Sequence, residues 1–293
     1  MLWITFLGTS GSAPTVERGM PAIALKYEKE LLVFDCGEGT QRQMMKYKAG
    51  YGSTNAIFIS HPHLDHYLGV FGLFETLNLM ARPRHKIYLH SFEELGKAME
   101  EKYPFVAYAP VKKGVIYKGE GFEIEAFSVK HTKGAYGFIF RENDRVKFHE
   151  KKAHSLGLRG RMFSEIQKKG SVMVGKKKVK LEDVSWTKKG IKVVYSGDTL
   201  PCPDLSKAAE NADLLVCEGT LDESLKEEAK ERLHCTMEDA AEIAKKAKVK
   251  QLAITHISPR YSDKKELEKF EKPVKKIFKN TVFAYDGMKM EIK

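Results

Sequence analysis

The sequence predicts a layered α/β fold, in which strands alternate with helices along most of the chain. Two observations carry this prediction. Short apolar runs recur, each followed by turn residues and a helix-like segment, and several of them stop at a carboxylate or an imidazole. A third observation is an interruption between about residues 143 and 183, where Lys, Arg and Gly dominate. We therefore expect one domain over residues 1–293 with an arm inserted at 143–183.

Six predicted strands end at a residue that can bind a metal or move a proton. These residues are Asp35, His61, His131, Asp198, Glu218 and His256. Any single one of them also fits an ordinary loop. Because all six hold the same position relative to a strand, we expect the strand ends to meet at one shared rim.

Three segments carry helix patterns. The nearly continuous apolar stretch over residues 65–80 predicts a buried helix that covers a sheet. Residues 264–279 predict a charged helix that Pro273 kinks or divides. Thr236, with Asp239 three residues later, predicts the N-cap of a further helix.

The composition is that of a soluble, globular protein. Hydrophobic residues make up 42% of the chain and no apolar run approaches the length of a membrane span. Residues 1–7 are short, lack a basic leader and run into a turn, which favours a first strand over a signal peptide. The four cysteines lack CxxC spacing, which is typical of free thiols in a reducing compartment. We expect a cytoplasmic protein without a membrane partner.

The charge is concentrated in one place. Residues 145–192 hold 15 Lys or Arg against 4 Asp or Glu, which accounts for the whole formal net charge of +11. A single Lys pair of this kind equally fits a solvated surface. An excess confined to one segment makes a local positive field that suits a phosphate backbone. The glycines and the few β-branched residues of this segment predict an arm of short helices and loops, without a second core.

The segment from His61 to His66 places four metal-competent side chains within six residues. Imidazole and carboxylate suit a borderline divalent ion such as zinc. Because no Cys pair lies nearby to complete a closed structural site, we predict a catalytic one. The full candidate set exceeds what one tetrahedral zinc can use, and therefore predicts two ions: His61, His63, Asp65, His66, His131, Asp198 and His256.

Two ions at this site predict hydrolysis. Paired ions generate hydroxide from water near neutral pH and stabilise charge on a phosphoryl or acyl group, and a carboxylate such as Asp198 can bridge them. Asp65 is placed to take the proton of the water. Glu218 and His234 form a candidate pair that protonates the leaving group. On its own, His234 equally fits an ordinary residue at a helix start.

The order of these motifs resembles that of the metallo-β-lactamase superfamily, which implies a four-layer αββα sandwich. More specific stretches resemble the short form of ribonuclease Z over nearly the whole chain: Phe6-Leu-Gly-Thr9, Asp35-Cys-Gly-Glu-Gly-Thr-Gln41, Ala212-Asp-Leu-Leu215, Glu218 with Thr220, His234-Cys-Thr236 and His256-Ile-Ser-Pro-Arg-Tyr261. The resemblance implies an endonuclease that removes the 3′ trailer of precursor tRNA. It would leave a 3′-hydroxyl on the tRNA and a 5′-phosphate on the trailer.

The resemblance also implies a role for each site residue. One zinc would take His61, His63, His131 and Asp198, and the other Asp65, His66, Asp198 and His256. Asp65 would be the general base, and Glu218 with His234 would help to protonate the leaving 3′ oxygen. Arg260 would lie near the scissile phosphate, and Asp35 would orient the ligands.

For the arm, the resemblance implies a grip on tRNA away from the active site. The candidate contacts are Arg159, Arg161, Lys176, Lys177 and Lys178. The resemblance further implies a homodimer, in which the arm of one subunit serves the site of the other. Two alternatives remain open: a hydrolase of small phosphodiesters or esters that has the same site, and an RNA-binding protein whose metals only hold the fold.

Overall fold

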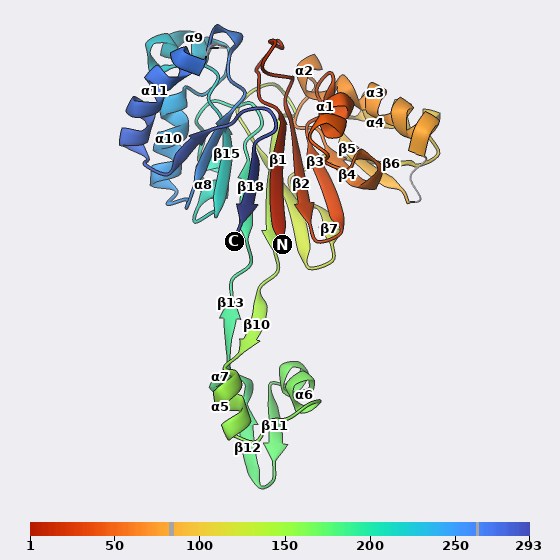
Figure 1. Cartoon of the computed structure of the whole chain (residues 1–293), viewed down its shortest axis with the longest axis vertical. Coiled ribbons are helices and arrows are strands. Elements are labelled where there is room, and N and C mark those ends of the chain that lie inside the picture. Colours follow the sequence, from red (N-terminus) through yellow and green to blue (C-terminus); the bar gives the residue numbers. More distant parts are fainter. Residues whose placement is uncertain (82–84, 262–263) are drawn as a thin grey trace. The chain divides into compact units, whose positions relative to one another are not determined.

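The computed structural model describes residues 1–81, 85–261 and 264–293. The chain forms two compact units, one made of residues 1–141 and 191–293 and the other of residues 142–190. The larger unit contains two seven-stranded sheets, and the smaller one contains two two-stranded sheets with short helices (Figure 1). The inserted unit thus extends past both ends of the expected arm.

The first large sheet contains the N-terminal strands. The last strand of the chain and its first three strands pair with one another antiparallel. The remaining three strands extend the sheet in parallel. In spatial order its strands are β18 (Lys289–Ile292), β1 (Leu2–Gly8), β2 (Ala22–Tyr27), β3 (Glu30–Phe34), β4 (Thr54–Phe58), β5 (Ile87–Ser91) and β6 (Val106–Pro110).

The second large sheet is also mixed. Four consecutive strands are parallel, and the remaining three continue the sheet in antiparallel pairs. In spatial order its strands are β17 (Thr281–Phe283), β16 (Leu252–Thr255), β15 (Leu214–Glu218), β14 (Lys192–Tyr195), β9 (Tyr136–Glu142), β8 (Phe122–Ser128) and β7 (Gly114–Gly119).

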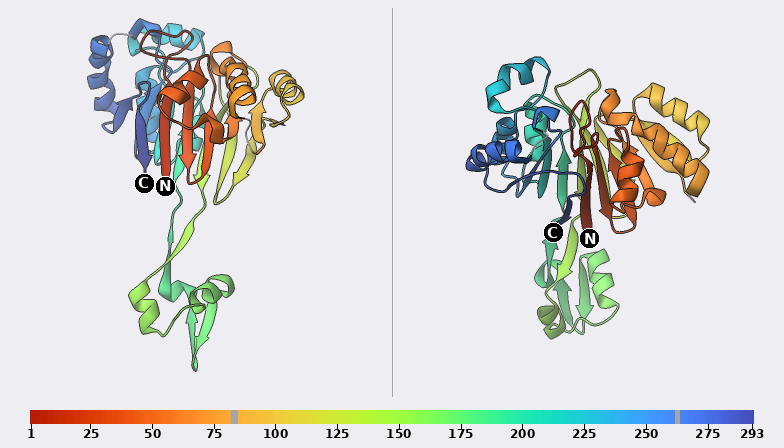
Figure 2. Two further views of the ribbon diagram at one scale, coloured as in Figure 1. Left: turned by 45° about the vertical axis from the view of Figure 1, so that its right-hand side comes forward. Right: turned by 45° about the horizontal axis from the view of Figure 1, so that its top comes forward.

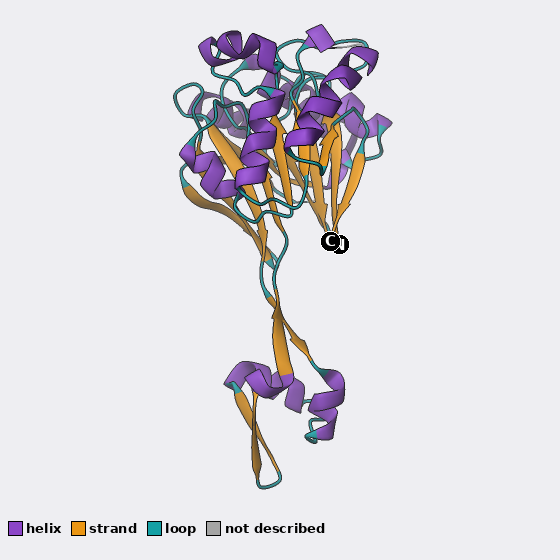
Figure 3. Ribbon diagram, turned by 90° about the vertical axis from the view of Figure 1, so that its left-hand side faces the viewer, coloured by secondary structure: helices purple, strands orange, loops and turns teal. Residues whose placement is uncertain are grey.

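The two large sheets face each other across an apolar core. Side chains alternate along a strand, so Ile4 and Phe6 of β1 meet Phe138 and Phe140 of β9 between the sheets. The outer face of each sheet is covered by helices (Figures 2 and 3). The predicted four-layer αββα sandwich is confirmed.

Helices α1 (Thr40–Lys46), α2 (Leu64–Tyr67), α3 (Gly69–Thr76) and α4 (Glu93–Lys102) lie with the first sheet, and α8 (Pro203–Ala209), α9 (Lys226–Glu231), α10 (Met237–Lys246) and α11 (Lys264–Ile277) lie with the second. Short turns of other helix types lie between them: Tyr51–Ser53, Leu77–Ala81, Glu223–Leu225 and Pro259–Tyr261. In the part of the chain that the structure describes, no helix is both long and apolar enough to cross a membrane.

The helix predictions hold in part. Thr236 caps α10 and Asp239 completes a capping box, as expected. Residues 65–80 do not form one helix: α2 and α3 are separated at Leu68, and a π-helical turn follows. A Cβ atom on Gly69 would lie 1.9 Å from the carbonyl oxygen of Gly37, so only glycine permits this close approach. Pro273 does not divide α11.

The smaller unit corrects a prediction. It has a core of its own, formed by Ala153, Leu158, Ile166, Val172, Val179 and Val184. The sequence hides this core because its apolar residues are single and widely spaced among Lys and Gly. The elements of the unit are β10 (Arg145–Phe148), α5 (Glu150–Ser155), α6 (Met162–Lys169), β11 (Ser171–Val174), β12 (Lys177–Lys180), α7 (Leu181–Val184) and β13 (Ser185–Lys188).

Candidate active site

The polar residues at the strand ends come together, although they belong to two different sheets. Asp35 and His61 follow β3 and β4 of the first sheet. The second sheet supplies the other four: His131 lies in the loop after β8, Asp198 follows β14, Glu218 ends β15 and His256 follows β16. Around this rim, metal-competent atoms lie within 4.8 Å of one another in three groups: the two described below, and a third that consists of Asp198, His234 and His256.

The backbone is strained at two of these strand ends. Asp35 has a φ of 53° and His256 a φ of 56°, in the left-handed region that L-residues rarely adopt. Next to His256, Gly11 lies so close that a Cβ atom there would be 2.5 Å from Nδ1 of the imidazole. The chain thus bends sharply to direct these two side chains into the rim.

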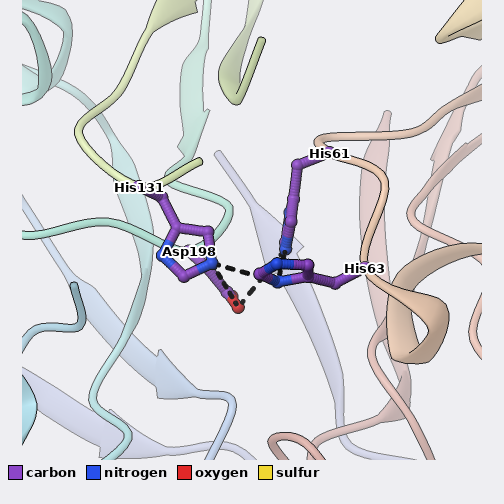
Figure 4. A group of neighbouring side chains, drawn as sticks. All are labelled: His61, His63, His131 and Asp198. Atoms are coloured by element: carbon purple, nitrogen blue, oxygen red, sulfur yellow. Dashed lines mark hydrogen bonds and ion pairs between the residues drawn. The ribbon is translucent and has the colours of Figure 1, made fainter. Parts of the chain in front are cut away.

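The first group consists of His61, His63, His131 and Asp198, whose polar atoms point toward one another (Figure 4). Nδ1 of His63 lies 2.9 Å from Nε2 of His61 and 3.1 Å from Nε2 of His131. Oδ2 of Asp198 lies 3.7 Å from His61 Nε2 and 3.9 Å from His131 Nε2. Three imidazoles and one carboxylate therefore surround one small volume.

The second group consists of Asp65, His66 and His256. Oδ2 of Asp65 lies 3.5 Å from Nε2 of each histidine. The same Oδ2 of Asp198 that faces the first group lies 3.2 Å from His66 Nε2 and 3.3 Å from His256 Nε2. Asp198 is therefore common to both groups.

Hydrogen bonds fix the tautomers of four histidines. His66 Nδ1 lies 2.8 Å from Oδ2 of Asp35, and His131 Nδ1 lies 2.9 Å from the carbonyl oxygen of Leu233. Both oxygens only accept, so each Nδ1 carries a hydrogen, and in the neutral form of each ring the lone pair then lies on Nε2.

The other two histidines reach the same state through a hydroxyl group. Thr220 donates its one proton to Glu218 Oε2 at 2.6 Å, so it accepts the hydrogen bond from His256 Nδ1 at 2.8 Å. Ser60 Oγ donates to Asp35 at 2.9 Å and likewise accepts from His61 Nδ1 at 2.9 Å. Nε2 of His66 and Nε2 of His256 are buried without a hydrogen-bond partner. Buried lone pairs that face carboxylates are what a divalent cation requires, so the residues fit a metal site.

The charge states agree with metal binding. Burial and the neighbouring His66 hold the pKa of His61 well below its usual range, so this imidazole is neutral. Burial opposes ionisation of Asp198, but His256 and His66 outweigh it and hold the pKa of Asp198 well below the usual range. For His66, Asp198 and Asp35 outweigh burial and raise the pKa, so a proton competes with a cation for its Nε2.

Glu218 and His234 form a close pair beside these groups. His234 Nδ1 lies 2.9 Å from Oε1 and 3.1 Å from Oε2 of Glu218. Burial opposes protonation of the imidazole, but the carboxylate raises the pKa of His234 to about 9. Its ring stacks on that of His256 with 5.4 Å between centroids. His234 therefore holds a proton at neutral pH at the edge of the metal site.

The remaining predicted residues lie outside the two metal-binding groups. Arg260 is exposed, and its guanidinium forms a two-point ion pair with Glu228 of α9 at 2.7 and 2.8 Å. In the smaller unit, Arg159 Nη1 donates to the carbonyl oxygens of His154 and Leu158, so it braces its own turn. Arg161 is exposed directly before α6. Lys176, Lys177 and Lys178 are exposed at the turn of the β11–β12 hairpin.

The sequence did not reveal several residues that hold the ligands in place. Tyr195 donates to Asp35 Oδ2 at 2.6 Å, the backbone N–H of Ser60 donates to Asp35 Oδ1 at 2.7 Å, and the backbone N–H of Ser12 donates to Asp65 at 3.1 Å. Ser60 had a signal, since it directly precedes His61. Tyr195 had none, because its place in the chain is that of an ordinary core aromatic.

The fold and this site define a metal-dependent hydrolase of the metallo-β-lactamase superfamily. A family model described as a beta-lactamase superfamily domain matches residues 183–257, and one described as the anti-Pycsar protein Apyc1 matches residues 2–156. Over its whole length the chain belongs to the ribonuclease Z family. It is 42% identical to the ribonuclease Z of Methanosarcina acetivorans, with 100% of this chain and 98% of the relative covered.

Further comparisons agree with this assignment. The ribonuclease Z of Archaeoglobus fulgidus is 39% identical, over 99% of this chain and 97% of its own length. The crystal structure of the short form of human tRNase Z superposes with a TM-score of 0.70 at 26% identity and covers 99% of both chains. The metallo-β-lactamase-fold protein YhfI of Bacillus subtilis, at 17% identity and a TM-score of 0.72, shares the fold. The predicted family and the predicted metal-dependent nuclease are confirmed.

Proposed function

We propose that this protein is an endoribonuclease that removes the 3′ trailer from precursor tRNA with two zinc ions per subunit. Cleavage leaves a 3′-hydroxyl on the tRNA and a 5′-phosphate on the trailer. The observation that carries this proposal is the pair of donor groups that share Asp198, with buried imidazole lone pairs turned toward its carboxylate. The full-length ribonuclease Z relatives and the human tRNase Z structure supply the substrate class.

The donor atoms divide between the two ions. His61, His63 and His131 would hold one, Asp65, His66 and His256 would hold the other, and Asp198 lies close enough to both groups to serve either ion. When bound, such ions lower the pKa of water and stabilise negative charge on phosphate oxygens. Cysteine is absent from both groups, as in other catalytic rather than structural zinc sites.

Two proton transfers fall to the residues of the chain. His66 and His256 outweigh burial and hold the pKa of Asp65 well below its usual range, so Asp65 is ionised and can take a proton as general base. His234, kept protonated by Glu218, is the acid that donates to the departing 3′ oxygen. Because Thr220 contacts both Glu218 and His256, the acid pair and one metal ligand are held by a single hydroxyl group.

The smaller unit serves as the tRNA grip. Its 49 residues contain 14 Lys or Arg against 6 Asp or Glu. The exposed Lys176, Lys177, Lys178 and Arg161 supply charge for phosphates, with Arg159 at the adjoining turn. The active protein is a cytoplasmic homodimer in which the arm of one subunit serves the site of the other, as proposed from the family.

Cleavage of one precursor tRNA with mapped ends tests the proposal, together with the zinc content of the protein. We expect a single cut at the base of the trailer, and Asp65→Ala should abolish it while leaving tRNA binding largely intact. A folded, zinc-loaded protein that leaves the precursor intact would refute the proposal.

A hydrolase of small phosphodiesters is the competing function. To separate the two, residues 143–190 are replaced by a short Gly-Ser linker, which leaves both large sheets complete. We expect turnover of a small model diester to persist while tRNA cleavage collapses. Equal loss of both activities would contradict a separate role of this unit in binding tRNA.

A further inference from the structure

Strands β10 and β13 form a two-stranded ribbon (Figure 1). Its register places different side chains on its two faces. In its antiparallel register, Arg145 lies opposite Lys188 and Lys147 lies opposite Trp186. Because side chains alternate along a strand, these four residues share one face, and all four are exposed. This face thus carries one indole beside three cations, with Trp186 opposite Lys147 and two residues from Lys188 along β13, and we call it the Trp186 face.

The indole of Trp186 is unusually open. It is 49% exposed, and within the described residues no other aromatic ring packs against it. Trp186 is also one of the residues that line a hollow of about 540 Å³, and the others are Val146, Gly170, Lys180, Leu181, Glu182, Ser185 and Thr187. A large aromatic side chain kept in water costs solvation free energy, and a ligand that covers the ring recovers it.

Two of the three cations on this face are available for a ligand. Arg145 forms an ion pair with Glu142 at 2.6 Å. By contrast, neither Lys147 nor Lys188 forms an ion pair within the described ranges of the chain. The whole unit is positive, so the field at this face attracts anions.

We propose that the Trp186 face binds RNA, with one nucleobase stacked on the indole and the flanking phosphates held by Lys147 and Lys188. An aromatic ring between lysines matches the alternation of flat bases and charged phosphates along a strand. A base within a duplex is already stacked on both neighbours. The base that Trp186 takes is therefore unpaired or lies at a helix end, such as a base in a tRNA loop.

This inference rests on the proposed function, since it takes tRNA as the ligand of the smaller unit. It adds a second RNA contact besides the one proposed at Arg161 and Lys176 to Lys178. The two contacts differ in kind. Those side chains offer charge alone, whereas Trp186 distinguishes an exposed base from a duplex backbone. An acidic peptide or an anionic membrane would also bind the lysines, but it has no nucleobase to stack on the indole.

Fluorescence tests the stacking directly, because the chain has only two tryptophans. Trp3→Phe leaves Trp186 as the single indole, and Asp65→Ala prevents cleavage during a titration. We expect mature tRNA to quench this fluorescence and a blunt, loop-free RNA duplex of equal length to quench it much less. Equal quenching by the duplex, or quenching by phosphatidylserine vesicles in place of tRNA, would overturn the proposal.

Substitutions test the energetic role. Trp186→Leu should weaken tRNA affinity roughly 5- to 100-fold and raise KM with little change in kcat, whereas Trp186→Phe should keep most of the affinity. The double variant Lys147→Gln with Lys188→Gln should lower the slope of log affinity against log salt by about 1 to 2, and Lys151→Gln on α5 is the matched control. Unchanged affinity in Trp186→Leu, with normal cleavage, would refute the stacking site alone. A wild-type protein that binds no tRNA would instead refute the proposed function.

Discussion

Nδ1 of His234 lies 2.9 Å from Oε1 of Glu218, and this carboxylate outweighs burial to raise the pKa of His234 to about 9. The imidazole therefore carries a proton throughout the neutral range. A rate that depends on this proton falls as the pH rises through 9, because only the protonated form can donate.

Glu218→Gln should lower the pH above which the cleavage rate falls, which we call the alkaline limit. The amide keeps a hydrogen-bond acceptor but loses the charge, so the strongest interaction that opposes the effect of burial is lost and the pKa of His234 falls. We expect the single-turnover rate near neutral pH to drop by roughly 10- to 1,000-fold, with partial recovery in mildly acidic buffer. Rate against pH, with the pKa of His234 followed by NMR, checks this. An alkaline limit that stays in place would argue against His234 as the acid.

Asp198→Ala should remove more metal than the loss of any other single ligand. Asp198 belongs to the first donor group and its Oδ2 also lies 3.2 Å from His66 Nε2 and 3.3 Å from His256 Nε2, whereas His63 belongs only to the first group. We therefore expect Asp198→Ala to lose both ions and His63→Ala to lose chiefly one, as measured by metal analysis after gel filtration. Chelator treatment of the wild type should abolish cleavage, and zinc should restore it. Equal metal content in the two variants would show that the carboxylate is not shared.

Asp35→Asn should weaken metal binding without touching a metal. Its carboxylate accepts hydrogen bonds from His66, Ser60 and Tyr195, and the amide would turn a donor toward one of them. We expect a 10- to 100-fold loss of zinc affinity, roughly the usual effect of removing such a supporting partner. Tyr195→Phe removes one donor but leaves His66 oriented, so it should cost less. Competition with a zinc-sensitive dye measures both.

His90 should make the fold sensitive to acid. Its imidazole is buried, both ring nitrogens lack hydrogen-bond partners, and burial lowers its pKa to about 4. An unfolded histidine titrates near pH 6.5, so between about pH 6.5 and 4 the unfolded state binds a proton at this residue and the folded state does not. Stability should fall as the pH drops from about 6.5 to 4, by on the order of 3 kcal/mol in total.

His90→Phe tests this effect. The ring of His90 lies parallel to that of Phe58 with 4.8 Å between centroids, and phenylalanine can keep this packing. Urea unfolding at several pH values should show a flatter acid limb for the variant than for the wild type. Parallel pH profiles for the two proteins would show that other groups cause the acid sensitivity.

The sequence predicted the rim of the site because each signal was local. A short apolar run followed at once by His61 or Asp198 shows both the strand and the residue that its end presents. The roles of Thr220 and Tyr195 could not be predicted in this way. Tyr195 reaches Asp35 across 160 residues of sequence, and Thr220 acts only because the ends of β15 and β16 lie side by side.

The core of the smaller unit was missed for a related reason. Val172 and Val179 pair across the β11–β12 hairpin, yet along the chain each is a single apolar residue near several lysines. The lysines near these valines in the sequence conceal the apolar pattern of the hairpin. The pattern becomes visible only where the two strands pair. The Trp186 face likewise depends on register, since Lys147 and Trp186 are far apart in sequence and opposite each other in the ribbon.

The metal donors come from two sheets that are joined by the backbone alone, since all four cysteines are free. His61, His63 and His66 follow β4 of the first sheet, whereas His131, Asp198 and His256 follow strands of the second. An ion coordinated by both sets would cross-link the two sheets at one edge. This cross-link can form only in the folded chain, where the two sets lie together. A free divalent ion that binds this site would therefore enter the folding equilibrium, and the free energy of unfolding would rise with the logarithm of its concentration. The thermal stability of this protein would accordingly depend on the concentration of the free ion in the buffer as well as on the amino-acid sequence.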